Sequence, residues 1–454
     1  MNIALVFPPL YGVDMPPLGI AYIAGQLLSD GHKVSVFCFN SQLYTEDKNK
    51  QFLWNWENSG QWTSLEKINK NFNARDLAER WAEAVLERSP KVIGLSVNSH
   101  SRILADLLAD TLRKKSKDAC IVFGGPFCAE IAESEDLNNN VDVYVRGEGE
   151  KIISRIAGII EHGGSIRDSA IEGTLLNTGS GFKDNGWDMN PLNIDDIALP
   201  ALQLFDFERY NNKVEIPIIF SRGCNYSCAF CTDAPMWGRY RMRSAGNIIG
   251  EIIKHSKLFG RRRFKCNDLM VNGDLERLGQ LADKMIAGRN NFEWGGMARA
   301  RIEMSQEFLN KIKKAGGIYF TYGIESGASR VLAHMGKPLK RHISQALRRT
   351  HDSGIRVNTL WMAGYPIERW SDIIETMFFL FNNRKYIDEF VSVSSCYIPH
   401  KSRLWREQGS LNIRYNKNSE WYIKGKNTPK IREIRRGMLL GLAKISGIYK
   451  GGIS

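Results

Sequence analysis

Three cysteines fall within eight residues of the chain, at Cys224, Cys228 and Cys231. They follow an apolar run over 216–220 and a turn over 221–223. Thiolates are soft ligands that suit iron–sulfur clusters, zinc or copper(I). A structural zinc site would need a fourth cysteine or histidine at short spacing, but the next histidine is His255. Three thiolates would leave one iron of a [4Fe–4S] cluster open to another molecule. The spacing therefore favours a cluster over zinc or three unrelated buried cysteines.

The C-x3-C-x2-C run resembles the signature of the radical S-adenosylmethionine (SAM) enzymes. The resemblance implies that Cys224, Cys228 and Cys231 hold a [4Fe–4S] cluster whose open iron chelates the methionine moiety of SAM. An electron from the cluster would then split SAM to a deoxyadenosyl radical, and a reductant such as flavodoxin or ferredoxin would supply it. The resemblance also implies that Phe230, the aromatic residue before the third cysteine, lies beside the adenine.

From Val214 onward, strands and helices alternate along the chain. The expected strands are 216–220, 263–271, 294–299, 318–324, 357–362 and 390–397, with helices 245–259, 274–287, 305–315, 343–353 and 371–382 between them. Six such units predict an incomplete (β/α) barrel over 214–405, which is the core that the resemblance implies. Chemistry in barrels lies at the carboxyl ends of the strands.

Polar residues stand at these predicted strand ends: Asn267, Asp268, Arg299, Glu325, Ser326 and His400. The resemblance implies SAM contacts for Arg299, Glu325 and Ser326. Physically, a guanidinium can pair with the methionine carboxylate, and a carboxylate can accept from the ribose or the ammonium. A salt bridge between neighbouring strand ends is the alternative. The turn after the last strand, 399–402, departs from the family's frequent P-G-T sequence, so the substrate mouth stays unassigned.

The first part of the chain shows another alternation, with expected strands at 2–7, 33–39, 92–97, 120–123 and 141–145. It predicts an α/β domain over 1–165 with a doubly wound parallel sheet. Ligands bind such sheets at the carboxyl ends of the strands. The candidate ligand loops are 8–18, 96–100, 124–127 and 146–149, and the residues chosen from them are Ser96, Gly124, Gly125 and Gly147. For any one glycine, a tight turn explains the residue equally well.

The order of these loops resembles the cobalamin-binding domain that precedes the radical SAM domain in one subgroup. The phrases Phe-Pro-Pro9, Pro-Pro-Leu-Gly19, Gly-Gly-Pro126 and Arg-Gly-Glu-Gly-Glu150 carry the resemblance. It implies a bound cobalamin. The D-x-H-x-x-G motif, whose histidine ligates cobalt in other cobalamin enzymes, is absent, so neither a protein histidine nor the cofactor's own base is expected on cobalt. A scaffold that binds no cofactor is the alternative.

Three segments remain. The polar, tryptophan-rich stretch 45–73 is expected to be an insertion, and 166–213 a linker with a short hairpin. Residues 406–454 are expected to be a basic helical extension, with ten Lys/Arg against two Asp/Glu between 411 and 454, out of a net charge of +13. A helix over 430–445 is expected to close the open side of the barrel with a cationic face outward. No nucleic-acid partner and no membrane association are expected.

The compartment and the activity follow from these features. Eight cysteines without a regular framework favour a reducing compartment, and the absence of an apolar run of about 20 residues fits a cytoplasmic protein. The combined resemblance implies a cobalamin-dependent radical SAM methyltransferase acting on an unactivated carbon of a small molecule or peptide. One SAM would methylate cobalamin, and a radical from another would abstract hydrogen. The alternatives are a cyclising or rearranging radical SAM enzyme without cobalamin, and a non-enzymatic iron–sulfur protein.

Overall fold

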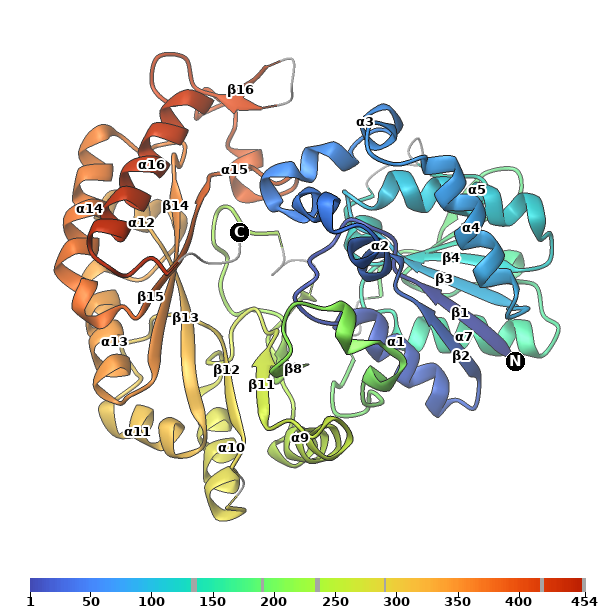
Figure 1. Cartoon of the computed structure of the whole chain (residues 1–454), viewed down its shortest axis with the longest axis horizontal. Coiled ribbons are helices and arrows are strands. Elements are labelled where there is room, and N and C mark those ends of the chain that lie inside the picture. The colour runs from blue at the N-terminus through green and yellow to red at the C-terminus, as the bar shows by residue number, and fades with distance from the viewer. Residues whose placement is uncertain (132–136, 189–191, 233–236, 290, 417–419, 451–454) are drawn as a thin grey trace. The chain divides into compact units, whose positions relative to one another are not determined.

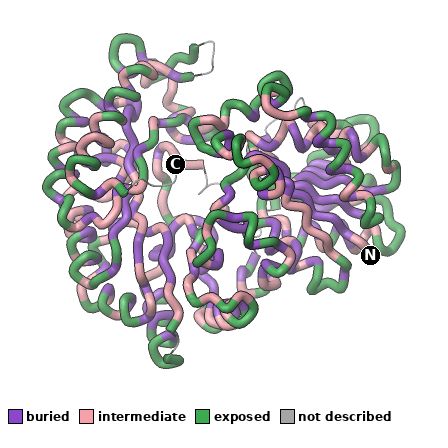
Figure 2. Tube along the Cα trace, viewed as in Figure 1, coloured by how far each residue is buried: buried purple, intermediate pink, exposed green. Residues whose placement is uncertain are grey.

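The computed structural model describes residues 1–131, 137–188, 192–232, 237–289, 291–416 and 420–450. The chain divides into two compact units, Met1–Val214 and Glu215–Ser454, called here the N-terminal and C-terminal units. Each contains a parallel sheet flanked by helices (Figure 1). Figure 2 shows that the strands of both sheets are largely buried, whereas the outer turns of the helices are exposed. The predicted α/β fold class is confirmed.

The N-terminal unit is built on a seven-stranded sheet in the order β2-β1-β3-β4-β5-β6-β7. Its strands are β1 (Asn2–Val6), β2 (Lys33–Phe37), β3 (Val92–Ser96), β4 (Cys120–Gly124), β5 (Val143–Val145), β6 (Thr174–Asn177) and β7 (Phe182–Asp184). The first five run parallel, and β6 and β7 are antiparallel. The order reverses beside β1, so the β1–β3 pair is the topological switch point.

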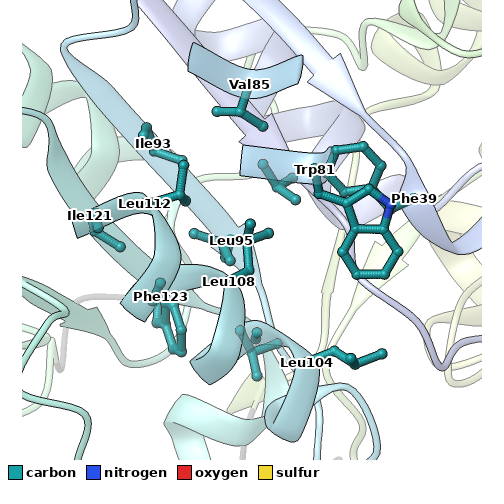
Figure 3. Close-up of a cluster of buried hydrophobic side chains, with 14 of the residues drawn as sticks. Phe39, Trp81, Val85, Ile93, Leu95, Leu104, Leu108, Leu112, Ile121 and Phe123 are labelled. Carbon is teal, nitrogen blue, oxygen red and sulfur yellow. The ribbon is translucent and has the colours of Figure 1, made fainter. Parts of the chain in front are cut away.

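Four long helices cover this sheet: α1 (Leu18–Ser29), α4 (Ala74–Leu86), α5 (Arg102–Lys115) and α7 (Glu150–Glu161). Helices α4 and α5 pack together over one face, and α1 and α7 pack together over the other (Figure 1). The apolar side of α4 and α5 meets β3 and β4 in a fully buried cluster, drawn in Figure 3. Phe39 and Trp81 stack there with ring centroids 4.8 Å apart. This packing fixes the helices and therefore the loops at the strand ends.

The tryptophan-rich insertion is ordered and packed. It consists of α2 (Phe39–Glu46), the 3-10 helices η1 (Lys48–Trp54) and η2 (Trp56–Trp62), and α3 (Leu65–Asn69). The indole N–H of Trp54 donates to Asn40 Oδ1 at 2.9 Å, and that of Trp62 donates to Leu53 O at 3.0 Å. Because both indoles are buried with satisfied N–H groups, the insertion extends the core.

The expectation of a linker over 166–213 is wrong for most of its length. Its hairpin, β6 and β7, extends the N-terminal sheet. Further on, Ala201 N–H donates to Ala21 O at 2.9 Å, and Asn211 N–H donates to Val13 O at 2.9 Å. A side chain at Gly25 would lie only 2.0 Å from Leu199 O, so glycine permits this close approach to α1. The segment therefore belongs to the N-terminal unit.

The C-terminal unit contains the six parallel strands that were predicted, in the order β15-β14-β13-β12-β11-β8. They are β8 (Glu215–Ile218), β11 (Arg263–Cys266), β12 (Glu293–Ala298), β13 (Gly317–Glu325), β14 (Arg356–Ala363) and β15 (Glu389–Ser395). The connecting helices are α9 (Ala245–Phe259), α10 (Leu275–Ala287), α11 (Gln306–Lys314), α13 (Lys340–Asp352) and α14 (Trp370–Asn383). Between β13 and α13 the structure contains a helix that was not predicted, α12 (Ser329–Met335).

The C-terminal segment is packed into this unit. It contains α15 (Arg403–Arg406), a small hairpin of β16 (Arg414–Tyr415) and β17 (Trp421–Tyr422), and α16 (Pro429–Ile445), which packs on β14, β15 and α14. Arg432 and Arg435 of α16 are buried, and Arg435 Nη1 lies 3.2 Å from Glu368 Oε1. The expected cationic outer face is therefore wrong for these two residues. Among the described residues, no helix is long and apolar enough to cross a membrane.

Candidate functional site

The loop that carries the three cysteines is held at its start by Asp268. This carboxylate follows β11 and is 4% exposed. It accepts the N–H of Phe220 at 2.9 Å and the hydroxyl of Ser221. Burial raises the pKa of Asp268 to about 7. Asp268, expected at an active strand end, thus positions the entry to the cysteine loop.

Two further contacts fix the path of the loop. Gly223 has φ +81°, and a Cβ there would lie 2.4 Å from Arg239 O, so only glycine fits without strain. Between the second and third cysteines, Ala229 N–H donates to Met335 O at 3.1 Å and Ala229 O accepts from Leu404 N–H at 2.9 Å. The loop is therefore bracketed by α12 on one side and by the start of α15 on the other.

The three cysteines are half-buried on this loop, and none of them forms a disulfide. No three histidine, cysteine or carboxylate side chains in the described ranges are gathered closely enough to hold a single metal ion. A mononuclear zinc site would bring its sulfurs to within roughly 4 Å of one another, given zinc–sulfur bonds of about 2.3 Å. A cluster spaces its thiolates more widely, because each binds a different iron. Binding of a cluster by Cys224, Cys228 and Cys231 stays a prediction from their spacing in the sequence.

Arg299 reaches the cysteine loop from the end of β12. Its Nη1 lies 3.5 Å from Cys228 Sγ, its Nη2 donates to Gly336 O at 2.6 Å, and its guanidinium lies 3.7 Å from the ring centroid of Tyr226. Asn272 clamps its backbone in both directions, since Arg299 N–H donates to Oδ1 at 3.0 Å and Asn272 Nδ2 donates to Arg299 O at 2.7 Å. A cation is therefore fixed beside the second cysteine.

Glu325 and Phe230 meet through a lysine. Lys337 Nζ lies 3.1 Å from Glu325 Oε1, donates to Gly323 O at 2.8 Å and sits 5.4 Å from the Phe230 ring centroid. Glu325 has φ +66°, an uncommon conformation for a non-glycine residue that clusters at functional sites. Burial raises the pKa of Cys224, and the charges of Arg299 and Lys337 oppose that shift. Residues from the ends of β12 and β13 thus converge on the cysteine loop.

The other expected residues of this unit are placed differently. The Ser326 hydroxyl is buried, lies 3.2 Å from Thr376 Oγ1 and accepts from Ala328 N–H at 3.1 Å. These contacts tie the β13 end to α14, and the SAM contact of Ser326 stays a prediction. His400 is exposed, and its ring lies 4.7 Å from that of Trp405.

In the N-terminal unit, the loops after β1 and β3 are joined at the switch point. Asn98 Nδ2 donates to Leu10 O at 3.0 Å, and Asn98 Oδ1 accepts from His100 N–H at 2.8 Å. On the other side, the side chain of Asn40 donates to Tyr11 O at 3.1 Å and accepts from Tyr11 N–H at 3.0 Å. The two asparagines hold the switch-point loops in fixed conformations, which is what a preformed ligand site requires.

The selected residues Ser96, Gly124 and Gly125 lie together beside this switch point. A Cβ at Gly125 would lie 2.8 Å from Val97 O and 3.2 Å from Ser96 Oγ, and Gly125 has φ +96°. Glycine is required there by the turn itself. At Gly124 a Cβ would meet only the Val145 side chain, at 4.0 Å, and at Gly147 it would meet nothing within 4 Å. These two glycines leave room for a ligand, whose binding by all four residues stays a prediction.

Arg146, which opens the Arg-Gly-Glu-Gly-Glu phrase, has a structural role. Its buried guanidinium pairs with the carboxylate of Asp184, donates to Gly186 O at 2.7 Å and stacks 4.9 Å from the Trp187 ring centroid. The hydrogen bond from Arg146 lowers the pKa of Asp184. The arginine thus fastens the β7 hairpin to the loop after β5.

Sequence analysis missed Lys337, Tyr226, Asn272 and the pair His334–Tyr365. His334 Nδ1 lies 2.8 Å from the Tyr365 hydroxyl, burial lowers the pKa of His334, and Arg403 donates to His334 O. A signal for Lys337 was available, because it directly follows Gly336, the left-handed C-cap of α12. Because α12 was not predicted from the sequence, Lys337 was not recognised as a residue of the candidate site.

Residues 218–380 match the model of the radical SAM superfamily, a span that includes the three cysteines, Arg299, Glu325 and Lys337. The chain carries a radical SAM domain. The chain is therefore an enzyme with a radical SAM domain, and the alternative of a non-enzymatic iron–sulfur protein is not supported.

Three curated relatives are distant in sequence, but their alignments with this chain cover most of both proteins. It is 24% identical to an uncharacterized methyltransferase of Pyrococcus horikoshii, over 93% of this chain and 86% of the relative. It is 22% identical to an anaerobic magnesium-protoporphyrin IX monomethyl ester cyclase of Synechocystis, over 88% and 76% respectively. It is 23% identical to the cytidylyl-2-hydroxyethylphosphonate methyltransferase of Streptomyces wedmorensis, over 79% and 71%.

Two solved structures share the fold. The radical SAM methyltransferase TsrM from Kitasatospora setae, with cobalamin and a [4Fe–4S] cluster bound, matches with a TM-score of 0.67 at 15% identity, over 90% of this chain and 78% of that chain. The cobalamin-dependent radical SAM enzyme OxsB, with aqua-cobalamin and SAM bound, matches with a TM-score of 0.71 at 15% identity, over 97% and 66%. These matches confirm the predicted fold, an α/β domain followed by a radical SAM barrel, which this chain shares with cobalamin-dependent radical SAM enzymes.

Proposed function

We propose that this enzyme binds a [4Fe–4S] cluster, SAM and cobalamin, and methylates an unactivated carbon of a small molecule or peptide. The convergence of Arg299, Glu325 and Lys337 on the loop of Cys224 and Cys228 carries the proposal. When bound, the cluster and the two cofactors supply reductive cleavage of SAM and a transferable methyl group. The protein supplies position and exclusion of water.

The three cysteines would ligate the cluster, and the charged side chains around them would orient SAM. The guanidinium of Arg299 can pair with the methionine carboxylate, because its planar fork matches a carboxylate. Glu325 can accept from the ribose or the ammonium, with Lys337 holding the carboxylate in place. Phe230, packed beside Lys337, offers a flat apolar surface for the adenine.

Cobalamin would bind at the carboxyl edge of the N-terminal sheet. Ligands bind such sheets where the strand order reverses, and the reversal beside β1 therefore supports a site at the loops after β1 and β3. Open space at Gly124 and Gly147 and the fixed Ser96 loop support a corrinoid site there. TsrM and OxsB, which share the fold, bind cobalamin in their structures.

Cyclisation without cobalamin is the second candidate. The relative from Synechocystis is named a cyclase, and its match covers 88% of this chain. The two candidates differ in their products, since methylation yields S-adenosylhomocysteine alongside a heavier product, whereas cyclisation does not. Incubation of the reduced, reconstituted enzyme with candidate substrates and methyl-labelled SAM tests this. Labelled product with S-adenosylhomocysteine supports methylation, and SAM cleavage with an unlabelled product supports cyclisation.

The cellular setting follows from the same chemistry. None of the eight cysteines, all of which lie in the described residues, forms a disulfide, as is usual in a reducing cytoplasm. We place the enzyme there, with flavodoxin or ferredoxin as reductant. Reduction of the reconstituted protein by each donor, followed as deoxyadenosine release, tests the reductant.

A further inference from the structure

Helix α14 exposes a stripe of large apolar side chains. Trp370, Ile374, Phe378 and Phe381 are 46%, 48%, 65% and 45% exposed. At 3.6 residues per turn these positions fall within about 80° around the helix and span about 16 Å along it. Contiguous exposed apolar surface of this kind marks an interaction site. These four residues are called the α14 stripe below.

A groove of about 520 Å³ runs beside the α14 stripe, between α13 and α14. Ile374 and Phe378 line it on the α14 side, and Lys340 and Arg341 line it on the α13 side. Lys340 pairs with the half-buried Glu375 across the groove. The groove therefore combines an apolar wall with a cationic rim.

Cations surround the α14 stripe at both ends. Arg369 precedes it, and Arg384 and Lys385 follow it, all exposed. The Arg384 guanidinium lies 3.8 Å from the Phe381 ring centroid, so it extends along the apolar surface. Among the exposed residues of α14 there is no carboxylate. This pattern of apolar side chains flanked by arginine and lysine is typical of helices that lie in a membrane interface.

We propose that the α14 stripe and the α13–α14 groove dock this enzyme on an anionic lipid surface. Ile374, Phe378 and Phe381 would enter the headgroup–acyl boundary, and Arg341, Arg384 and Lys385 would contact the phosphates. A second copy fits less well, because a two-fold contact would bring these cations against their own symmetry mates. From the sequence we expected no membrane association. The cationic residues considered there belong to the C-terminal helix, and the structure buries two of them, Arg432 and Arg435. The inference is independent of the reaction proposed above.

Flotation of the purified full-length protein with phosphatidylglycerol–phosphatidylcholine vesicles tests the docking. The protein should float with these vesicles and not with pure phosphatidylcholine. Phe378→Ser should lower the partition coefficient about tenfold, because a phenyl side chain leaves the interface. Arg341→Glu should lower it about fivefold or more, since each cation near an anionic surface contributes roughly this factor. Leu258→Ser and Lys257→Glu, on the exposed side of α9, are the matched controls and should float like the parent.

Four results would overturn the proposal. The first is no flotation with anionic vesicles, and the second is equal flotation of the parent and Phe378→Ser. The third is a concentration-dependent dimer, seen by light scattering, that Phe378→Ser disperses, because it would assign the stripe to self-association. Vesicle-independent binding of an acidic protein, with no flotation, would assign it to a protein partner.

Discussion

The guanidinium of Arg299 lies with Nη1 3.5 Å from Sγ of Cys228, although 71 residues separate them in the chain. The contact joins the end of β12 to the cysteine loop after β8. Thiolates and a cluster bring negative charge to a half-buried place, and a fixed cation offsets it. The same guanidinium keeps donor capacity for a carboxylate, so we propose that Arg299 connects the cysteine loop to SAM.

Replacing this cation should affect both cofactors. We expect Arg299→Gln to lower SAM affinity at least tenfold, because a charge-assisted hydrogen bond contributes about 1.5–3 kcal/mol. Iron retained after anaerobic reconstitution should fall as well. Isothermal titration with SAM and iron analysis measure the two effects. Arg348→Gln, on the exposed side of α13, is the matched control. Unchanged SAM affinity and iron content would show that Arg299 has only a structural role, through its contacts with Gly336 and Tyr226.

Replacing Glu325 should affect SAM binding without affecting the iron–sulfur cluster. Its carboxylate contacts Lys337 and no cysteine in the contacts described above, so Glu325→Ala should weaken SAM binding and leave the iron content unchanged. Lys337→Met provides the comparison, because it removes the partner that holds the carboxylate while keeping the length of the side chain. We expect weaker SAM binding in both variants. Normal SAM affinity in Glu325→Ala would make this carboxylate structural.

The buried carboxylate of Asp268 predicts a pH dependence of stability. Burial raises its folded-state pKa to about 7, above the unfolded value of about 3.9. Between these values the folded protein binds more protons, so its unfolding free energy falls as the pH rises from about 4 to 7, by up to ~1.4 kcal/mol per pH unit. Thermal unfolding midpoints of the anaerobic apoprotein at pH 5.5 and 7.5 measure this.

Asp268→Asn should show a smaller difference between the two midpoints and lower iron retention, since the amide offers one acceptor oxygen to Phe220 N–H and Ser221 where the carboxylate offers two. Burial also raises the pKa of Glu368 to about 7. Glu368 therefore makes its own contribution to the pH dependence of stability, and the Asp268→Asn variant keeps that contribution. An unaltered difference in Asp268→Asn would show that Asp268 titrates normally.

The C-terminal segment should matter for cluster retention. Trp421 of β17 is buried in one apolar cluster with Ala229 of the cysteine loop and with Met335 and Leu404, which bracket that loop. Trp421→Ala should cost about 3–5 kcal/mol of stability, the usual range for a buried tryptophan. We expect reduced iron per chain together with a lower unfolding midpoint. Trp187→Ala, at a 42% exposed position of the N-terminal unit, should retain iron. Full iron content in Trp421→Ala would show that the C-terminal segment does not support the cysteine loop.

The corrinoid site can be tested at Gly124. Its Cβ position is nearly open and its φ is ordinary, so Gly124→Leu should fold while its side chain fills the proposed ligand space. We expect loss of corrin absorbance after reconstitution with hydroxocobalamin, with unchanged iron. Gly158→Leu, at an open position of α7, should retain corrin. Equal corrin content in both variants would place cobalamin elsewhere or exclude this loop.

Much of the fold follows from local patterns. Apolar runs of strand length, separated by helical periodicity, locate all six strands of the barrel, and the parallel order then brings Arg299 and Glu325 to one edge. The cysteine spacing identifies the loop directly. These features are set by short-range sequence and need no knowledge of tertiary contacts.

The remainder depends on contacts between distant residues. The cluster of cations near the C-terminus looks solvated in the sequence, but Arg435 is buried against Glu368, 67 residues earlier. The hairpin of β6 and β7 looks like part of a linker because Lys183 and Asp184 of the edge strand β7 are exposed. Lys337 becomes a site residue only because α12 brings it to Glu325 and Phe230.

The most direct test of the central claim is metal analysis after anaerobic reconstitution, joined to SAM cleavage. We predict about four irons per chain and reductive release of deoxyadenosine, with both lost when Cys224, Cys228 or Cys231 is replaced by alanine and both kept in Cys120→Ala. One equivalent of zinc without iron, or four irons that survive the loss of any of the three cysteines, would contradict the account.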